Sequence, residues 1–316
     1  MRHALVTGGA GFVGSHLVDR LLREGDWQVT VLDNFDPFYP RSVKEGNLAR
    51  HADDAHLTVV EGDLRDPEAL ARCGASPIDV VVHLAARAGV RPSLEDPVGY
   101  ESVNVGGTQV LLEQARRWGV PQFVFGSSSS VYGVDPHVPW HEDASVLRPI
   151  SPYAATKVAG ELLGHVTSHL YGMRFLALRL FTVYGPRQRP DLAIHKFARL
   201  ILAGEPIPVY GDGTTSRDYT YVADVVQGIR AAMDYTASPF EVINLGHDRT
   251  VSLDAMIAAL EAALGKQAER TPLPAQPGDV PRTWADLEKA RRLLDYRPQT
   301  SFEEGMRAFA AWLRAH

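Results

Sequence analysis

The sequence has 316 residues, of which 45% are hydrophobic and 22% are charged, a composition typical of a folded globular protein and not of a disordered chain. The formal net charge of -6, without a block of five or more Lys and Arg residues, argues against nucleic acid and anionic membranes as partners. No apolar run reaches the roughly 18 residues that a membrane helix needs. The single cysteine, Cys73, excludes an intrachain disulfide and suits a reducing compartment, so we expect a cytoplasmic protein.

Short β-branched runs alternate with helical patterns through the first half of the chain. We expect strands at residues 4–7, 28–33, 57–61, 78–84, 122–125 and 175–180. This alternation is typical of right-handed crossover units and a mostly parallel sheet. A long helix is predicted to begin at Ser151 and Pro152 and to end at Gly172, with an apolar face made of Val158, Leu162, Val166 and Leu170.

After about Phe181 the pattern becomes richer in Pro and Gly, with helices expected near residues 191–203, 222–234, 253–264, 284–294 and 302–314. We therefore predict an α/β protein with a doubly wound, Rossmann-type parallel sheet and a smaller C-terminal α/β lobe. The first unit is assigned to residues 1–180, with 222–246 returning to it, and the second to residues 181–316. The segment 271–279 is either a flexible linker or an ordered loop that lines a cleft.

A glycine cluster lies between the first predicted strand and its helix. Gly8, Gly11 and Gly14 permit the backbone to approach a pyrophosphate, and the helix N-terminus offers free N–H groups to it. Asp33 ends the second strand, where a carboxylate can accept hydrogen bonds from the adenosine ribose hydroxyls. The same carboxylate repels a 2'-phosphate, so the pattern favours NAD over NADP. A tight turn without a ligand is the alternative for the glycines alone.

The third and fourth predicted strands also end in residues suited to a ligand. Asp63 follows the third strand, and the fourth ends in Leu84, Ala85 and Ala86. Ligands of such sheets bind beyond the carboxyl ends of the strands, where small side chains leave room for a flat cofactor. Plain packing explains the two alanines equally well.

Tyr153 and Lys157 are four residues apart near the start of the long helix, so they share one of its faces. A phenol with a pKa near 10 is a poor base, but an adjacent ammonium and an oxidised nicotinamide both favour the phenolate. The hydroxyls of residues 127–130 follow the strand at 122–125 and are expected beside the same cofactor. This combination predicts hydride transfer from an alcohol carbon.

Together these residues resemble the extended short-chain dehydrogenase/reductase family over essentially the whole chain. Within it, the sequence is most similar to nucleotide-sugar 4-epimerases, above all the UDP-glucuronate 4-epimerases, in segments 83–93, 127–133, 182–191, 217–221 and 276–282. The resemblance implies that Ser128, Tyr153 and Lys157 form the catalytic set. The residues expected to hold NAD are Gly8, Gly11, Phe12, Val13, Gly14, Asp33, Asn34, Asp63, Leu64, Leu84, Ala85, Ala86, Tyr153 and Lys157.

The resemblance further implies that Arg217, Asp279 and Arg282 bind the UDP portion of a UDP-sugar. A glucuronate oxidised at C4 is a β-keto acid that readily loses carbon dioxide, so its carboxylate must be held still. Hydroxyl donors with an arginine suit this role, since charge-assisted hydrogen bonds to a carboxylate are strong. The full set expected on the substrate is Arg91, Ser127, Ser128, Ser129, Thr182, Arg189, Arg217, Asp279 and Arg282.

Differences from neighbouring families reduce the number of reactions that the sequence is expected to support. Sugar 4,6-dehydratases carry an Asp-Glu pair where this chain has Ser129 and Ser130, and UDP-glucuronate decarboxylases carry a Glu at the second position. UDP-glucose 4-epimerases usually have Asn at position 182 and Arg at position 276, which weakens that alternative without removing it. A non-catalytic NAD-binding sensor is a distant third possibility. Gln188 departs from the small residue of the glucuronate pattern, which leaves the geometry of Arg189 open.

Two further expectations concern assembly and metals. By analogy with the family, we expect a homodimer formed through helices near residues 95–117 and 152–171. We predict no metal site, because His165 and His169 have helical spacing but no evident third ligand.

Overall fold

The structure is a computed structural model that describes residues 1–144, 148–274 and 280–316. The expected substrate residue Asp279, and position 276, on which the comparison with UDP-glucose 4-epimerases partly rests, lie outside the described residues.

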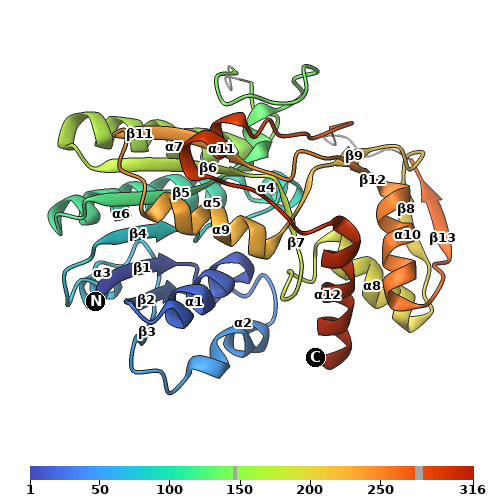
Figure 1. Ribbon diagram of the computed structural model, residues 1–316, viewed down its shortest axis with the longest axis horizontal. Coiled ribbons are helices and arrows are strands. Elements are labelled where there is room, and N and C mark those ends of the chain that lie inside the picture. Colours follow the sequence, from blue (N-terminus) through green and yellow to red (C-terminus); the bar gives the residue numbers. More distant parts are fainter. Residues whose placement is uncertain (145–147, 275–279) are drawn as a thin grey trace.

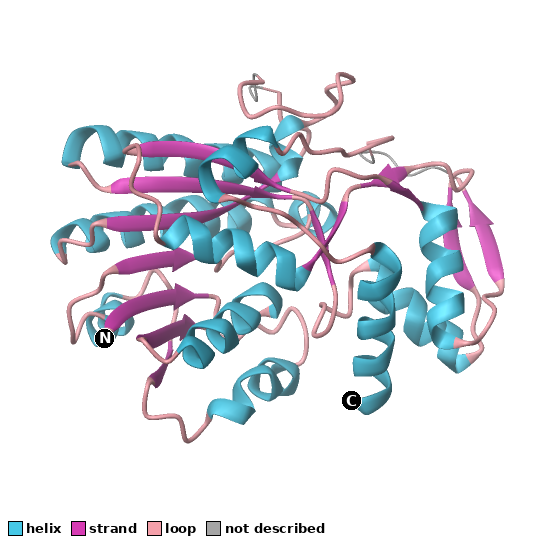
Figure 2. Cartoon of the chain, in the orientation of Figure 1, coloured by secondary structure: helices cyan, strands magenta, loops and turns pink. Residues whose placement is uncertain are grey.

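The centre of the molecule is a seven-stranded parallel sheet (Figures 1 and 2). Its strand order is β11-β6-β5-β4-β1-β2-β3, so the order reverses between β1 and β4 and opens a crevice there. The predicted strands are confirmed, with β4 shorter and β5 longer than expected. The strands are β1 (Arg2–Thr7), β2 (Trp27–Asp33), β3 (Leu57–Glu61), β4 (Val80–His83), β5 (Gln122–Ser128), β6 (Arg174–Leu180) and β11 (Phe240–Leu245).

Helices cover both faces of this sheet, which is why its central strands are nearly continuous apolar runs. One apolar core lies between the sheet and α1 (Phe12–Glu24), α9 (Val222–Met233) and α11 (Glu288–Leu294). The other core lies under α3 (Pro67–Cys73) and α6 (Gly107–Arg117), and α7 (Pro152–Tyr171) packs on β5 and β6 at the same face. The remaining segments around the sheet are α2 (Arg41–Leu48), η1 (Ala49–His51), α4 (Val90–Glu95), α5 (Pro97–Glu101), η2 (Ser102–Gly106) and η3 (Ser129–Tyr132).

Helix α7 begins and ends as predicted, but its apolar stripe does not face the core. Ser151 caps the helix by accepting a hydrogen bond from the Ala154 N–H at 3.1 Å, and Gly172 ends it with a left-handed φ of 70°. The predicted stripe residues are largely exposed, with exposed fractions of 59% for Leu162, 50% for Val166 and 60% for Leu170.

The buried face of α7 is set by glycines instead. Ideal Cβ atoms at Gly160 and Gly164 would lie 2.3 Å from the Phe125 ring and 2.1 Å from the Phe175 ring. The helix therefore lies too close to the sheet for larger side chains at these positions, and Leu162, Val166 and Leu170 point away.

The smaller lobe lies at the right of Figure 1 around its own apolar core. Its helices α8 (Ala193–Ala203), α10 (Leu253–Leu264) and α12 (Phe302–Ala315) match the expected ones closely. The segment expected as a linker or loop contains a strand, because residues 270–273 pair with β8. The short strands are β7 (Thr182–Tyr184), β8 (Ile207–Tyr210), β9 (Ser216–Arg217), β10 (Tyr219–Tyr221), β12 (Val251–Ser252) and β13 (Arg270–Leu273).

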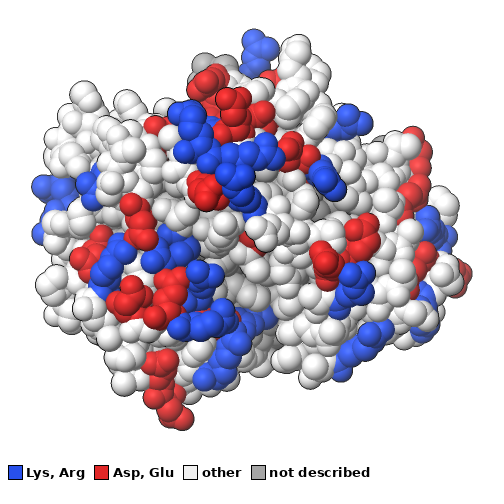
Figure 3. All heavy atoms as spheres, in the orientation of Figure 1, with Lys and Arg blue, Asp and Glu red and all other residues white. Residues whose placement is uncertain are grey.

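On the face shown in Figure 3, acidic and basic side chains lie interspersed rather than in one large patch of a single sign. Within the described ranges, none of the helices is both long enough and apolar enough to span a bilayer.

Candidate active site

A cleft of about 1020 Å³ runs along the carboxyl ends of the central strands. Its walls come from the glycine turn after β1, from the ends of β2, β4, β5 and β6, from the start of α7, and from the smaller lobe. All fourteen residues expected to hold NAD line this cleft. Of the expected substrate residues, those that line it are Ser127, Ser128, Ser129, Thr182, Arg189 and Arg217.

The glycine turn leaves bare backbone at the start of α1. Gly8 has a φ of +72°, and a Cβ there would lie 2.7 Å from the Ala85 nitrogen. At Gly14 a Cβ would lie 2.2 Å from the Gly8 carbonyl oxygen, so the turn closes tightly on the helix. Among the described residues no side chain caps α1 at Gly11, which leaves its first N–H groups to the cleft. This surface fits a pyrophosphate group.

At the end of β2, Asp33 is 6% exposed and its carboxylate is held in a fixed orientation. It accepts hydrogen bonds from the Ala10 N–H at 3.1 Å and the Phe35 N–H at 2.9 Å. Burial raises the pKa of the Asp33 carboxyl group, and the charge of Lys44, 3.9 Å away, opposes that rise. Asn34 donates to Asp63 at 3.4 Å, which joins two of the expected cofactor residues.

Four residues that the sequence did not single out also line the cleft. Tyr39 and Lys44 come from the segment after β2, and Arg87 and Tyr100 follow β4. Tyr39, Lys44 and Tyr100 reach the cleft only through tertiary structure, whereas Arg87 lies in segment 83–93, one of the segments that carry the family resemblance. For Tyr39 and Lys44, the only sequence signal is that they are polar residues shortly after Asp33, the expected ribose ligand.

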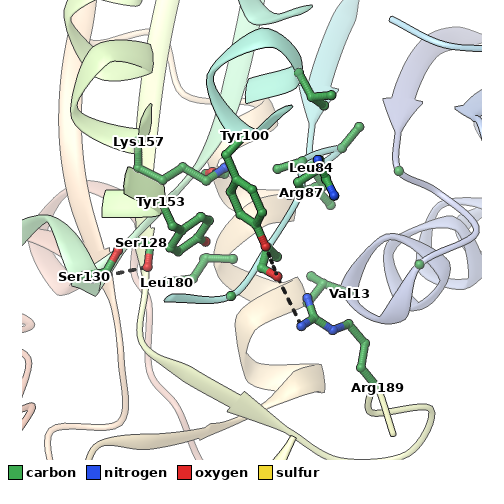
Figure 4. A pocket seen from close by; sticks show the side chains of 18 of the residues that line it. Val13, Leu84, Arg87, Tyr100, Ser128, Ser130, Tyr153, Lys157, Leu180 and Arg189 are labelled. Carbon is green, nitrogen blue, oxygen red and sulfur yellow. Dashed lines mark hydrogen bonds between the residues drawn. The ribbon is translucent and has the colours of Figure 1, made fainter. Parts of the chain in front are cut away.

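The three expected catalytic residues meet where β5 ends and α7 begins. Figure 4 shows Tyr153 and Lys157 extending from the same helix, with Ser128 beside the tyrosine ring. The Ser128 hydroxyl accepts a hydrogen bond from the Ser130 N–H at 3.2 Å. The Lys157 Nζ donates to the Gly126 carbonyl at 2.6 Å and lies 5.9 Å from the centre of the Tyr153 ring.

The two titratable groups have shifted pKa values in the protein alone. Burial raises the pKa of the Tyr153 phenol, while its hydrogen bond with Ser128 and the charge of Arg189 oppose that rise. Burial lowers the pKa of Lys157 to about 8, and Glu161 opposes that shift. Because burial raises the pKa of the Tyr153 phenol above its usual value near 10, the phenol is neutral near pH 7.

The hydroxyl cluster after β5 divides into two groups. Ser127 lines the cleft, but its hydroxyl donates to the buried carboxylate of Glu161 at 2.5 Å. The hydroxyl proton of Ser127 is therefore not available for a hydrogen bond to a substrate. Ser129 and Thr182 line the same wall. The Oγ atom of Ser130 is buried and has no hydrogen-bond partner among the described residues.

Arg189 reaches the middle of the cleft from the segment after β7. Its guanidinium makes a two-pronged ion pair with Asp191, with Nε–Oδ1 and Nη2–Oδ2 distances of 2.9 and 2.7 Å. Its Nη2 also donates to the Ala88 carbonyl at 3.4 Å, as Figure 4 shows, and the group lies 5.2 Å from the Phe38 ring centre. The positive charge of Arg189 is therefore already partly neutralised by Asp191.

The other expected arginines lie at or beside the cleft. Arg217 lines it and donates to the Ser216 carbonyl at 2.9 Å. Arg91 and Arg282 are not among the lining residues. Arg91 lies over the Tyr210 ring with 5.6 Å to its centre, and Arg282 donates to the Ser216 hydroxyl at 3.2 Å.

Comparison with known proteins identifies the family. Residues 4–246 match the family model described as the NAD dependent epimerase/dehydratase family. The chain belongs to this family. This epimerase/dehydratase is 41% identical over 315 residues to a UDP-glucuronate 4-epimerase of Thermodesulfobacterium geofontis, covering 99% of this chain and 96% of the relative.

Solved structures of other family members share the fold of this epimerase/dehydratase. The UDP-glucuronic acid 4-epimerase of Bacillus cereus, in complex with UDP-glucuronic acid and NAD, is 38% identical with a TM-score of 0.93 and 99% of both chains covered. The UDP-glucose 4-epimerase of Thermotoga maritima, with UDP-glucose, is 33% identical with a TM-score of 0.90 and equal coverage. NAD is the family's cofactor, and the glycine turn with Asp33 fits it.

Proposed function

We propose that this protein is an NAD-dependent 4-epimerase that interconverts UDP-glucuronate and UDP-galacturonate. The observation that carries the proposal is the meeting of Ser128, Tyr153 and Lys157 at the carboxyl end of β5, inside the cleft that begins at the glycine turn. The cleft is large enough for a dinucleotide and a nucleotide-sugar to lie end to end. The similarity to UDP-glucuronate 4-epimerases over nearly the full length supports the choice of substrate.

Tyr153 acts as the base on the sugar. NAD, held by the residues of the glycine turn and Asp33, would supply the hydride acceptor and donor for C4 of the sugar. The phenolate of Tyr153 takes the C4 hydroxyl proton and later gives it back. Ser128, which favours the ionised form of the Tyr153 phenol, bridges the phenol and the sugar oxygen. Lys157 holds the nicotinamide ribose and contributes positive charge that favours the phenolate.

The hydroxyl cluster limits the reaction to epimerisation. At positions 129 and 130 the chain offers serines, which donate hydrogen bonds but do not act as acids or bases at neutral pH. Elimination of water needs a proton donor and acceptor at these positions. Without one, the 4-keto sugar is reduced again rather than dehydrated.

The carboxylate of a glucuronate is held by Ser129, Thr182 and Arg189. Loss of carbon dioxide from the 4-keto intermediate needs the C5–C6 bond perpendicular to the plane of the ketone. Donors that hold the carboxylate group in place keep the sugar out of that geometry. We assign Ser127 to the support of this cluster, since its hydroxyl donates to Glu161.

The two lobes divide the ligands. We assign residues 1–180 and 222–246 to NAD and the rest of residues 181–316 to the nucleotide-sugar. Arg217, with Arg282 close by, binds the uridine diphosphate. Arg91 contacts the substrate only if its side chain moves from the Tyr210 ring into the cleft when the nucleotide-sugar binds.

We further propose that the protein forms a homodimer in the cytoplasm. The exposed stripe of Leu162, Val166 and Leu170 on α7 is apolar and continuous, and burying it needs a second apolar surface. A second copy of the same helix supplies one around a twofold axis. Leu162→Glu should convert the dimer to a monomer in analytical ultracentrifugation, and a protein that is monomeric before the change refutes the assignment.

The experiment that tests the function follows two substrates by proton NMR. The purified protein is incubated separately with UDP-glucuronate and with UDP-glucose. Formation of UDP-galacturonate from the first, with little or no product from the second, is the expected result. Conversion of UDP-glucose alone would show that the protein is a UDP-glucose 4-epimerase instead. NAD binding without turnover of either sugar would refute an enzymatic role.

A further inference from the structure

A buried ion pair lies directly behind the proposed catalytic residues. Glu161 is one helical turn beyond Lys157 on α7, and Arg179 is on β6. The carboxylate accepts hydrogen bonds from Arg179 Nε at 2.9 Å and Nη2 at 2.8 Å. Both residues are nearly inaccessible to solvent, with exposed fractions of 5% and 3%.

This pair is tied to several neighbouring elements. Glu161 also accepts the Ser127 hydroxyl, the residue next to Ser128 at the end of β5. The Arg179 guanidinium stacks on Tyr132 of η3, 4.8 Å from the ring centre, and donates to the Glu142 carbonyl at 3.3 Å. Both carboxylate oxygens of Glu161 thus accept hydrogen bonds, which fix the orientation of its side chain.

Stability alone does not account for such a pair. Two buried charges cost desolvation that their attraction barely offsets, and apolar residues of the same volume serve a core equally well or better. What the pair supplies that apolar residues do not is a fixed negative charge one turn from Lys157. We propose that Glu161 is a positioning residue that acts through Lys157: its buried carboxylate, one turn along the same helix, keeps the Lys157 ammonium charged behind Tyr153.

The surroundings of Lys157 leave this task to Glu161. The Nζ atom faces the Gly126 carbonyl and the Phe125 ring of β5. His83 on β4 is buried and neutral, since burial lowers its pKa to about 3. Among the described residues, the charge that opposes the effect of burial on the pKa of Lys157 is that of Glu161.

The remaining groups packed around α7 do not replace that charge. Arg179 on β6 pairs with Glu161 and is itself a cation, so it offers Lys157 no negative charge. Tyr100 on α5 contacts the edge of the Tyr153 ring, and burial raises the pKa of both phenols, so they are neutral near pH 7. Removing the carboxylate therefore leaves Lys157 facing no negative group in the described part of the chain.

A direct test measures the titration of Lys157 itself. The chain has five lysines, so a protein labelled with ¹³C-lysine gives few signals, and Lys157→Met identifies the relevant one. Glu161→Gln keeps the shape and an acceptor oxygen but removes the charge. We expect the pKa of Lys157 to fall by ~1 unit, the usual scale for loss of a close opposite charge.

The matched control is Arg179→Lys, which keeps the charges of the pair but loses the two-pronged geometry. It should leave the Lys157 titration nearly unchanged. An unchanged titration in Glu161→Gln, or an equal shift in Arg179→Lys, overturns the proposal. If Glu161→Gln does not fold with Arg179 left unpaired, the double variant Glu161→Gln/Arg179→Met removes both charges, and its Lys157 pKa must still fall.

The catalytic consequence rests on the proposed function and is measured separately. In Glu161→Gln the basic limb of the kcat/KM profile should move to lower pH by the same interval as the Lys157 titration, while Glu161→Asp restores its position. A protein without epimerase activity would refute the proposed function but leave the NMR result intact. A shifted titration with an unshifted activity profile would refute the positioning role alone.

Discussion

At the scale of single residues, the proposed base is the phenol of Tyr153, and its surroundings in the protein favour the neutral form of that phenol. Burial favours the neutral phenol, and the Lys157 ammonium is directed at the Gly126 carbonyl. A positive nicotinamide adds the charge that shifts this balance. In the proposed mechanism we therefore expect proton removal by Tyr153 to depend on cofactor binding.

Tyr153→Phe removes the oxygen and keeps the ring. We expect kcat to fall on the order of 10²-fold or more, as the loss of a general base requires, with NAD affinity nearly unchanged. Steady-state kinetics and calorimetric titration of NAD measure the two quantities. Tyr100→Phe is the matched control, because Tyr100 lines the same cleft and donates to the Ala88 carbonyl, and it should cost far less. Full activity in Tyr153→Phe contradicts the assignment.

Thr182→Val removes one proposed donor to the sugar carboxylate at nearly constant volume. We expect more carbon dioxide and UDP-pentose per epimerisation event, since a less restrained carboxylate reaches the perpendicular geometry more often. Arg189→Met should act in the same direction. Product ratios from UDP-glucuronate are measured by NMR, with Thr58→Val on the exposed face of β3 as control. If neither cleft variant changes the ratio, the carboxylate is held by other groups.

The sequence predicted those site residues that belong to local patterns. Gly8, Gly14 and Asp33 flank strand ends, and the spacing of Tyr153 and Lys157 is a property of one helix. Contacts between elements that are distant in the sequence follow no local pattern, so the sequence did not predict them. The hydroxyl of Ser127 was expected on the substrate, and only the packing of α7 on β5 reveals that it donates to Glu161.

At the scale of elements, α7 shows why periodicity predicts a helix better than it predicts its buried face. The spacing of Leu162, Val166 and Leu170 is helical, but an apolar stripe is equally suited to a protein interface. The glycines decide the orientation, because Gly160 and Gly164 are the positions at which the backbone can rest on the rings of β5 and β6. Glycine has a low intrinsic helix propensity, so the sequence alone gives no reason to place these two residues on the buried face of a helix.

Gly164→Ala should destabilise the fold although alanine favours helices. Its Cβ would lie 2.1 Å from the Phe175 ring, and overpacking of this kind costs about 1–3 kcal/mol. Gly46→Ala in α2 is the matched control, since nothing lies within 4 Å of a Cβ there. That variant should gain about 0.4–1 kcal/mol from reduced freedom of the unfolded chain. Urea unfolding midpoints compare the two, and equal midpoints would show that α7 lifts away from the sheet without cost.

At the scale of the whole molecule, buried polar residues join the smaller lobe to the sheet. Asp218 is fully buried between β9 and β10 and accepts hydrogen bonds from the His247 N–H at 2.7 Å and the Ala285 N–H at 3.1 Å. Asn244 at the end of β11 donates to the Trp140 carbonyl at 2.8 Å. Arg217 thus stands on a segment that is anchored to the sheet, which fixes the position of the proposed substrate side of the cleft relative to the proposed cofactor side.

A second buried group, His83, makes the stability of the whole molecule depend on pH. It bonds with the hydroxyls of Thr7 at 2.7 Å and Thr108 at 2.9 Å, and burial lowers its pKa to about 3. The unfolded chain binds a proton at this histidine below about pH 6.5, whereas the folded protein does not. Its contribution is therefore complete above pH 6.5 and is lost at about 1.4 kcal/mol per pH unit as the pH falls toward 3.

His83→Gln isolates this contribution, because glutamine can bond with both hydroxyls and does not titrate. Between pH 7 and 5 the wild-type protein should lose about 2 kcal/mol more stability than the variant, measured by urea unfolding at each pH. Comparison with the variant is needed because burial raises the pKa of Asp218 to about 6, and this carboxyl group favours the folded state as the pH falls. Parallel pH dependences of the two proteins would mean that His83 takes up a proton inside the fold, with Thr7 and Thr108 both accepting hydrogen bonds from the imidazolium.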